Sequence, residues 1–154
     1  MMVENSILKE KYVSFYGVEA CPPGEVLEIE KKLNVTLPTD FKEISRFYSG
    51  GLLGGISHFS IASGDEEFNV VSETLRLRRA VGLNSKYVAL AEPAGSLILL
   101  NVSQGPGVVW CDALDIDGLE VVDFSNFIEA WDSYELFFQY LLEQERLERG
   151  GEGS

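Results

Sequence analysis

The sequence predicts an α+β fold, in which N-terminal helices and one long C-terminal helix pack against a mostly antiparallel (mixed) sheet of about five to six strands. Hydrophobic residues recur at helical spacing near both ends of the chain, whereas those between residues 87 and 122 fall in short runs rich in Val, Ile and Leu. A chain of 154 residues, of which 45% are hydrophobic, is long enough for one domain with a normal core. We therefore expect a single domain over residues 1–148.

Three helices are expected before the first double glycine. The first covers residues 5–16, and the second covers residues 23–33, because a proline at the start of a helix loses no needed hydrogen bond. Pro38 starts the third helix in the same way. This helix is expected to end at Gly50 or Gly51, since glycine adopts the left-handed conformation of a helix cap at little cost.

The middle of the chain combines one further helix with most of the strands. The helix is predicted over residues 68–82, where apolar residues lead to a terminal glycine. Strands are predicted at five places, the last of them as an edge strand: residues 58–61, 87–91, 96–102, 108–112 and 119–122.

The C-terminal helix is predicted to begin after Ser125, whose hydroxyl group can cap it. Apolar side chains then follow at helical spacing and form one continuous stripe, which consists of Phe127, Trp131, Tyr134, Phe138 and Leu141. Residues 149–154 are rich in glycine and contain no large apolar residue, so we expect them to form a flexible tail.

The composition restricts the location of the protein. No segment is apolar enough to cross a membrane, and the first residues lack the basic start and apolar run of a signal peptide. Cys21 and Cys111 stand far apart in the sequence. We therefore interpret them as free thiols of a cytoplasmic protein rather than as a disulfide.

The charge restricts the class of partner. The net charge is −13, and residues 111–154 carry twelve Asp/Glu but only two Lys/Arg. Such a charge disfavours direct binding of nucleic acid or of an anionic membrane, whereas it attracts a basic protein. An acidic surface can also serve solubility alone.

No residue pattern predicts catalysis, a metal site or a cofactor. His58 is the only histidine, and together with two distant cysteines it does not supply the matched ligands of a metal site. The glycines of residues 49–55 lack the Gly-Lys-Ser/Thr of a phosphate-binding loop, and residues 112–118, DALDIDG, depart from the spacing of a calcium loop. The arginines of residues 75–83, LRLRRAVGL, are expected to form internal ion pairs or a solvated helix face.

Glu30 lies beside the apolar face of the second predicted helix. One interpretation is a solvated residue at the edge of this face. The other is an acceptor for backbone N–H groups at the start of the third helix, because helix starts leave such donors free and favour negative charge. Both roles are structural.

Residues 30–51 resemble the opening pattern of the SUKH superfamily, also known as the Smi/Knr family. The pattern is a glutamate, a Leu-Pro, an Asp–aromatic pair and a double glycine, and the matching residues are Glu30, Leu33, Leu37, Pro38, Asp40, Phe41, Gly50 and Gly51. The segment 125–144, SNFIEAWDSYELFFQYLLEQ, is similar to the aromatic-rich closing helix of the family. Ser49 stands where an asparagine is common in the family.

This resemblance implies an α+β fold without catalytic apparatus or cofactor. In bacteria the superfamily consists largely of immunity proteins, which bind and neutralise toxins, so it implies a protein toxin as the partner. Together with the acidic charge it leads us to expect a basic toxin, a nuclease domain. Some members act as intracellular regulators or scaffolds, which leaves a regulatory interaction module without a toxin partner as the alternative.

The acidic C-terminal third is the predicted partner-binding region. Carboxylates around large aromatic side chains suit a surface that grips a basic protein, with steering from charge and affinity from ring burial. The residues assigned to this region are Asp112, Asp115, Asp117, Glu120 and Asp123, with exposed parts of Trp110 and Tyr134. The alternative is that the tryptophans belong to the core and that the acids are ordinary loop residues.

Overall fold

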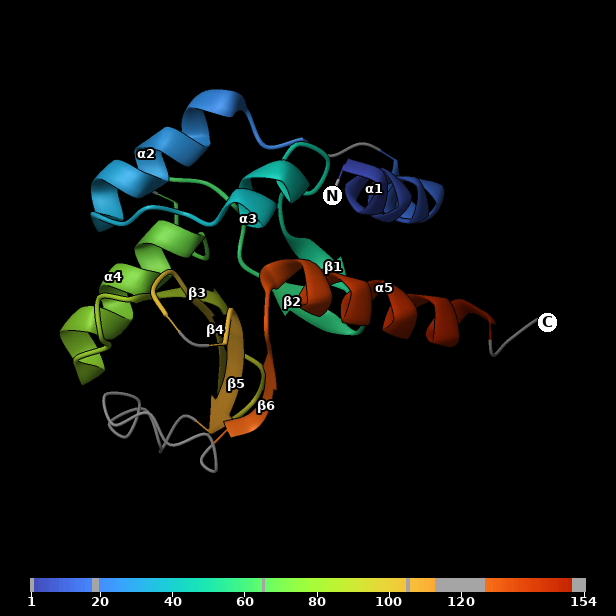
Figure 1. The fold of residues 1–154 in the computed structure, drawn as a ribbon. Helices are drawn as coiled ribbons and strands as arrows, with labels where there is room; N and C mark the ends of the chain where they lie inside the picture. Colours follow the sequence, from blue (N-terminus) through green and yellow to red (C-terminus); the bar gives the residue numbers. More distant parts are fainter. Residues whose placement is uncertain (1, 18–19, 65, 105, 113–126, 151–154) are drawn as a thin grey trace.

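The computed structural model describes residues 2–17, 20–64, 66–104, 106–112 and 127–150. Within these ranges it contains helices on both sides of a run of strands, which confirms the predicted α+β class (Figure 1). The elements are α1 (Met2–Tyr16), α2 (Pro23–Leu33), α3 (Thr39–Ile44), β1 (Gly51–Leu53), β2 (Ile56–His58), α4 (Val70–Val81), β3 (Tyr87–Ala91), β4 (Ser96–Asn101), β5 (Val108–Asp112), β6 (Phe127–Trp131) and α5 (Tyr134–Gly150).

The strands form one six-stranded sheet in the order β1-β2-β3-β4-β5-β6, and every pair of neighbours is antiparallel. The sheet is therefore a meander, in which each strand pairs with the strands next to it in sequence. The contact between β2 and β3 is short, with His58 opposite Ala91. Among the described residues, parallel pairing is limited to an isolated bridge between Ser60 and Asn69.

Both faces of the central strands are buried, because their side chains alternate between two cores. The larger core contains the helices and one face of the sheet, which carries Val88, Leu90, Ile98, Leu100 and Val108. The smaller core contains Leu77 of α4, Leu83 and the opposite face, which carries Tyr87, Ala89, Leu97, Leu99, Val109 and Cys111. This double burial explains why β3 and β4 consist of nearly continuous apolar residues.

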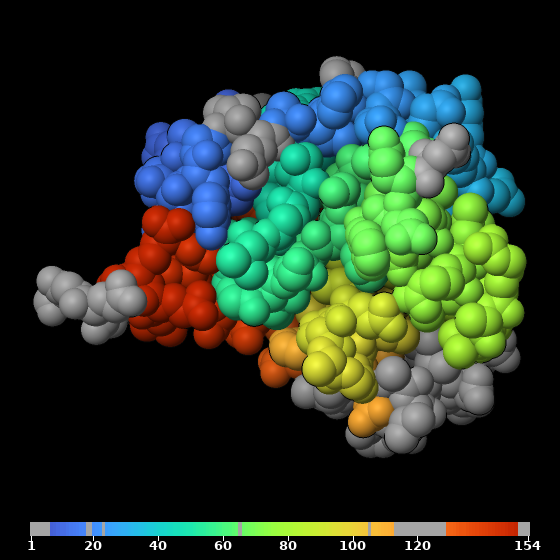
Figure 2. Space-filling model, turned by 180° about the vertical axis from the view of Figure 1, so that it is seen from behind, coloured from blue at the N-terminus to red at the C-terminus, as the bar shows by residue number. Residues whose placement is uncertain are grey.

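The helices surround the sheet on several sides. In Figure 1, α2, α3 and α1 lie across the top of the view, α4 lies at the side of the sheet, and α5 runs away from the end of β6 along the β1–β2 hairpin. Viewed from behind, α1 in blue rests on α5 in red (Figure 2). Helix α5 contacts α1, α3, β1 and β6, so it connects the beginning of the chain with both edges of the sheet.

The prediction that one helix starts after Ser125 is wrong for residues 127–131. These residues form β6, which pairs with β5 and places Trp131 opposite Val108, and α5 begins only at Tyr134. The spacing from Phe127 to Trp131 fits a helix, but hydrogen bonds to the free edge of β5 override this local preference. The Trp131 ring packs against that of Phe137 on α5, with 4.8 Å between the centroids.

Other boundaries differ less. Helix α3 is shorter than predicted, and the strand predicted at residues 58–61 lies slightly earlier, as β2. Gly50 and Gly51 lead into the β1–β2 hairpin instead of ending a helix directly. The strand predicted at residues 119–122 lies outside the described residues. Of the predicted tail, Arg149 and Gly150 belong to α5, and residues 151–154 lie outside the described ranges.

Candidate functional site

Several residues of the N-terminal pattern hold helices in place. Glu30 on α2 accepts a hydrogen bond from the Leu37 N–H (2.7 Å), just before α3 begins, and its carboxylate lies 3.1 Å from Lys42 Nζ. This geometry confirms the interpretation of Glu30 as an acceptor for a backbone donor near the third helix. Pro38 is the N-cap of α3, one residue before the first helical position that the sequence predicts for it.

Asp40 connects α3 with α5, a role that the sequence alone did not reveal. Its Oδ2 accepts a hydrogen bond from the Glu135 N–H (2.9 Å) in the first turn of α5. A carboxylate at this position accepts a hydrogen bond from a free backbone N–H, and its negative charge is stabilised by the positive end of the helix dipole. The neighbouring Phe41 is fully buried, and its ring lies 4.8 Å from that of Tyr134.

Glu145 forms a second buried connection, between α5, α1 and the β1–β2 hairpin. Its Oε1 accepts from the Gly54 N–H (3.0 Å), and its Oε2 accepts from the Tyr16 hydroxyl (2.9 Å) and from Arg149 Nε (2.7 Å). Burial alone would raise the pKa of Glu145, but hydrogen bonds from Arg149, Gly54 and Tyr16 outweigh burial and lower this pKa. Glu145 is therefore an ionised carboxylate that joins α5, α1 and the β1–β2 hairpin through hydrogen bonds.

The structure describes only part of the predicted acidic partner-binding region. Asp115, Asp117, Glu120 and Asp123 lie outside the described residues, whereas Asp112 ends β5. Trp110 is half-buried, and its Nε1 donates to Ser96 Oγ (2.9 Å). The prediction that Tyr134 is partly exposed is wrong, because only 4% of this residue is accessible. Tyr134 packs at the start of α5 among the rings of Phe41, Phe137 and Phe138.

The nucleophile and acid–base candidates lie in unreactive surroundings. His58 is buried, its Nε2 lies 3.3 Å from the Leu53 carbonyl oxygen, and burial lowers its pKa to about 4. Cys21 is buried and free, its thiol donates to the Ile61 carbonyl (3.2 Å), and burial raises its pKa to about 11. Cys111 is also buried and is not part of a disulfide. Throughout the described ranges, no group of three or more His, Cys, Asp or Glu is placed to hold a metal ion.

The buried His58 should make stability fall in mild acid. Its pKa is about 4 in the folded protein, against 6.5 in an unfolded chain, so the unfolded state takes up the proton first. The stabilising contribution is complete above pH 6.5 and is lost as the pH falls from 6.5 towards 4. Between pH 7 and pH 5 we expect a loss of about 2 kcal/mol in unfolding free energy from this group.

Urea denaturation at both pH values measures this loss. The control is His58→Gln, whose amide can still donate to the Leu53 carbonyl but does not titrate. Carboxylates contribute equally to both proteins, so the difference between wild type and variant isolates His58. An equal decline in both proteins would show that His58 is not the cause.

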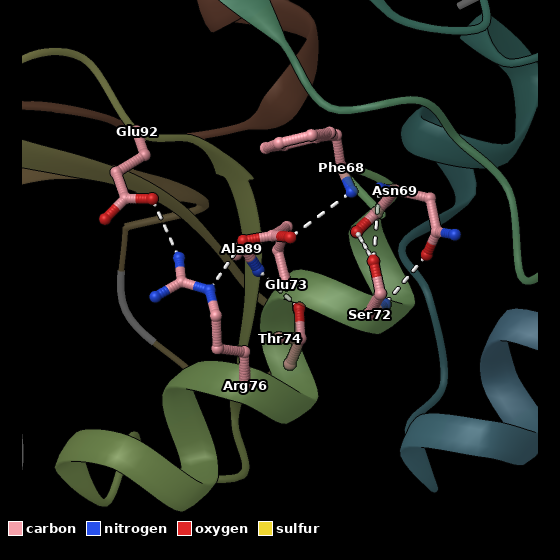
Figure 3. A network of polar contacts seen from close by, with 8 residues as sticks. All are labelled: Phe68, Asn69, Ser72, Glu73, Thr74, Arg76, Ala89 and Glu92. Carbon is pink, nitrogen blue, oxygen red and sulfur yellow. Dashed lines mark hydrogen bonds and ion pairs between the residues drawn. The ribbon is translucent and has the colours of Figure 1, made fainter. Parts of the chain in front are cut away.

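The segment before α4 presents an exposed aromatic side chain in an ordered frame (Figure 3). Phe68 is 66% exposed, and its φ of +67° lies in the left-handed region. Its N–H donates to Glu73 Oε2 (3.2 Å), and its carbonyl accepts from the Ser60 N–H (3.0 Å). Nothing in the sequence marks this conformation, because phenylalanine rarely adopts it.

Asn69 and Ser72 fix the start of α4 next to Phe68. The Asn69 side chain accepts from the Ser72 N–H (2.7 Å), and Ser72 Oγ accepts from the Asn69 N–H (3.2 Å), which together form a capping box. One turn later, Thr74 Oγ1 accepts from the Ala89 N–H (2.8 Å) at the irregular position of β3. These bonds join the N-terminal half of α4 to the sheet.

Arg76 confirms the expectation of internal ion pairs in the arginine cluster. Its Nε lies 2.7 Å from Glu73 Oε1, and its Nη2 lies 2.7 Å from Glu92 Oε1 (Figure 3). Arg78 Nη2 donates to the Ser85 carbonyl (3.3 Å), and Arg79 is exposed. The arginines therefore lie on the surface of α4, where Arg76 forms ion pairs within the chain.

Comparison with known proteins identifies the family. The profile of the SMI1 / KNR4 family (SUKH-1) matches residues 20–139, which is more than three quarters of the 154 residues. None of the curated proteins compared with the chain matches it. No helix in the described part of the chain is long and apolar enough to cross a membrane. The extent of the profile match, together with the α+β fold, shows that the chain belongs to the SMI1 / KNR4 family (SUKH-1).

Proposed function

We propose that this chain is a non-enzymatic immunity protein, which binds a cognate protein toxin in the cytoplasm and neutralises it. Membership of the SUKH-1 family is the observation that carries this proposal, because immunity proteins are known in the family. The buried, hydrogen-bonded states of His58 and Cys21 agree with a binding role rather than a catalytic one. The two buried cysteines do not form a disulfide, which agrees with a reducing compartment.

A basic nuclease domain is the toxin that best fits the charge of the chain. The net charge is −13, with most of the acidic excess after residue 110. Nucleases bind a polyanion and therefore carry basic surfaces, so an acidic inhibitor can be steered to the same path as the substrate. We propose the acidic region around Asp115 and Asp117 as the part of the chain that dominates this attraction.

The function is tested by rescue. The neighbouring reading frames are searched for a toxin domain, which is then expressed in cells with and without this chain while growth is measured. We expect growth to be restored only when both proteins are present. Failure of rescue would contradict the proposal. Reproducible recovery of a housekeeping protein, with a deletion phenotype in the absence of toxin, would instead indicate a regulatory module.

The acidic region is tested by reversing its charge. We expect Asp115→Lys combined with Asp117→Lys to slow association with the toxin domain steeply at low salt and less at high salt, because salt screens long-range attraction. The loss should be about 1 kcal/mol for each residue if both lie at the rim of the interface. Stopped-flow or surface-based kinetics over a range of salt concentrations measures this effect.

The matched control is Glu10→Lys combined with Glu28→Lys, which changes the net charge equally on the exposed faces of α1 and α2. If both double variants slow association to the same extent, net charge alone is responsible. Unchanged rates in the Asp115/Asp117 variant would place the partner elsewhere.

A further inference from the structure

Phe68 adopts a backbone conformation that its side chain disfavours. Among the described residues, only Asn34 and Phe68 combine a side chain with a positive φ. Asn34 is the left-handed C-cap of α2, a place where asparagine is common. A bulky residue in this region is an outlier, and such outliers concentrate at functional sites. The local fold would be better served by glycine or asparagine at position 68.

The phenyl ring does not serve the core either. At 66%, Phe68 is the most exposed large hydrophobic residue in the described ranges. The backbone around Phe68 is nevertheless fixed by hydrogen bonds. The Ser60 N–H donates to the Phe68 carbonyl, and the Val70 N–H donates to the Ser60 carbonyl (2.9 Å). The side chain of Asn69 also donates to the Glu66 carbonyl (2.8 Å). The ring is therefore displayed on a preorganised backbone, which lowers the entropy cost of binding.

A shallow hollow of about 380 Å³ lies beside the ring, and it is lined by Glu67, Phe68, Ser72, Glu73, Arg76, Arg79 and Glu92. Viewed from behind, the segment just before α4, α4 itself and the chain around residue 90 lie next to one another on one face of the molecule (Figure 2). Arg76 is already paired with Glu73 and Glu92, so its charge is compensated within the chain. The exposed Glu66 and Glu67 next to Phe68 give the rim an acidic character.

We propose that Phe68 is the anchor of a second contact with the partner, which offers an apolar socket rimmed by Lys or Arg. This inference rests on the proposed function, because the partner is taken to be the toxin. Aromatic side chains, Phe included, are enriched at the buried centres of protein interfaces, and the acidic rim complements a basic partner. An anionic membrane, which could also take up an exposed ring, is repelled by the same carboxylates.

The experiment uses Phe68→Asn, which removes the ring and suits the left-handed backbone. We expect the midpoint of urea denaturation to stay the same or to rise, while the affinity for the toxin domain identified by rescue falls at least tenfold. Leu27→Asn is the control, since Leu27 is 60% exposed on α2 and lies outside the hollow. Its affinity should equal that of the wild type. A Phe68→Gly variant should repeat both results of Phe68→Asn.

The outcomes separate this inference from the proposed function. If the wild-type chain does not bind the toxin domain, the proposed function fails, and the anchor loses its partner. If the wild type binds and Phe68→Asn binds equally well, only the anchor is refuted. A lower denaturation midpoint in both Phe68 variants would show that the ring stabilises the fold, which also overturns the inference.

Discussion

Gly50→Ala is expected to destabilise the protein by about 4 kcal/mol, enough to leave many small domains only marginally folded. A β-carbon at this position would lie 2.4 Å from the Phe59 carbonyl oxygen and 3.0 Å from the Ser60 α-carbon. Both atoms belong to the backbone, so the clash is relieved only by moving the chain. Overpacking contributes up to about 3 kcal/mol. The φ of +99° contributes the rest, because a β-carbon disfavours positive φ.

Gly51→Ala provides a matched control for this prediction. Gly51 has nearly the same φ, +98°, but a β-carbon there would meet no atom within 4 Å. We expect this variant to lose only about 1–2 kcal/mol, since the strain of the backbone is its sole cost. Chemical denaturation of both variants measures the difference. Equal losses would show that the contact with Phe59 is unimportant.

Glu145→Ala is expected to lower the free energy of unfolding by about 3 kcal/mol. The change removes a buried carboxylate and leaves the Gly54 N–H and the Tyr16 hydroxyl without the acceptor that they use in the native protein. Arg149 also loses its charged partner, although its guanidinium group still stacks on the Phe15 ring, 4.8 Å from the ring centroid. The junction between α5, α1 and the hairpin should therefore loosen.

The control for Glu145 is Glu143→Ala, two residues earlier on the same helix. Glu143 pairs with Arg146 at the surface, and both side chains are more than half exposed. Pairs of this kind add little to stability because water screens them. We expect the denaturation midpoint of Glu143→Ala to match that of the wild type. A similar midpoint in Glu145→Ala would mean that the buried network contributes nothing.

The sequence predicted the elements whose local signals and tertiary environment agree. Helix α4 shows this agreement, since Asn69 caps its start and Gly82 adopts the left-handed conformation at its end. The role of Glu30 as a hydrogen-bond acceptor could also be predicted, because the start of the next helix has free backbone N–H groups. Strands β3, β4 and β5 were recognisable from their continuous apolar residues.

The features that were missed depend on contacts between distant segments. Asp40 binds the backbone of Glu135, and Glu145 binds Gly54, pairs that are 95 and 91 residues apart in the chain. Residues 127–131 carry a helical pattern, but the free edge of β5 draws them into the sheet. Phe68 carries no local signal at all, since only the backbone shows that it is strained. Long-range geometry of this kind cannot be read from a single sequence.

The meander order of the sheet affects how fast the molecule forms and how long it lasts. The pairs β1–β2, β3–β4 and β4–β5 are joined by short loops and can form quickly, whereas α4 lies between β2 and β3 in the chain. The hydrogen bond between Tyr16 and Glu145 of α5 joins residues that are 129 positions apart in the chain. We therefore expect α5 to pack against α1 after the sheet has formed. Weakening such a late contact speeds unfolding but hardly slows folding. We therefore expect changes that weaken the docking of α5 to shorten the lifetime of the folded protein rather than to slow its formation.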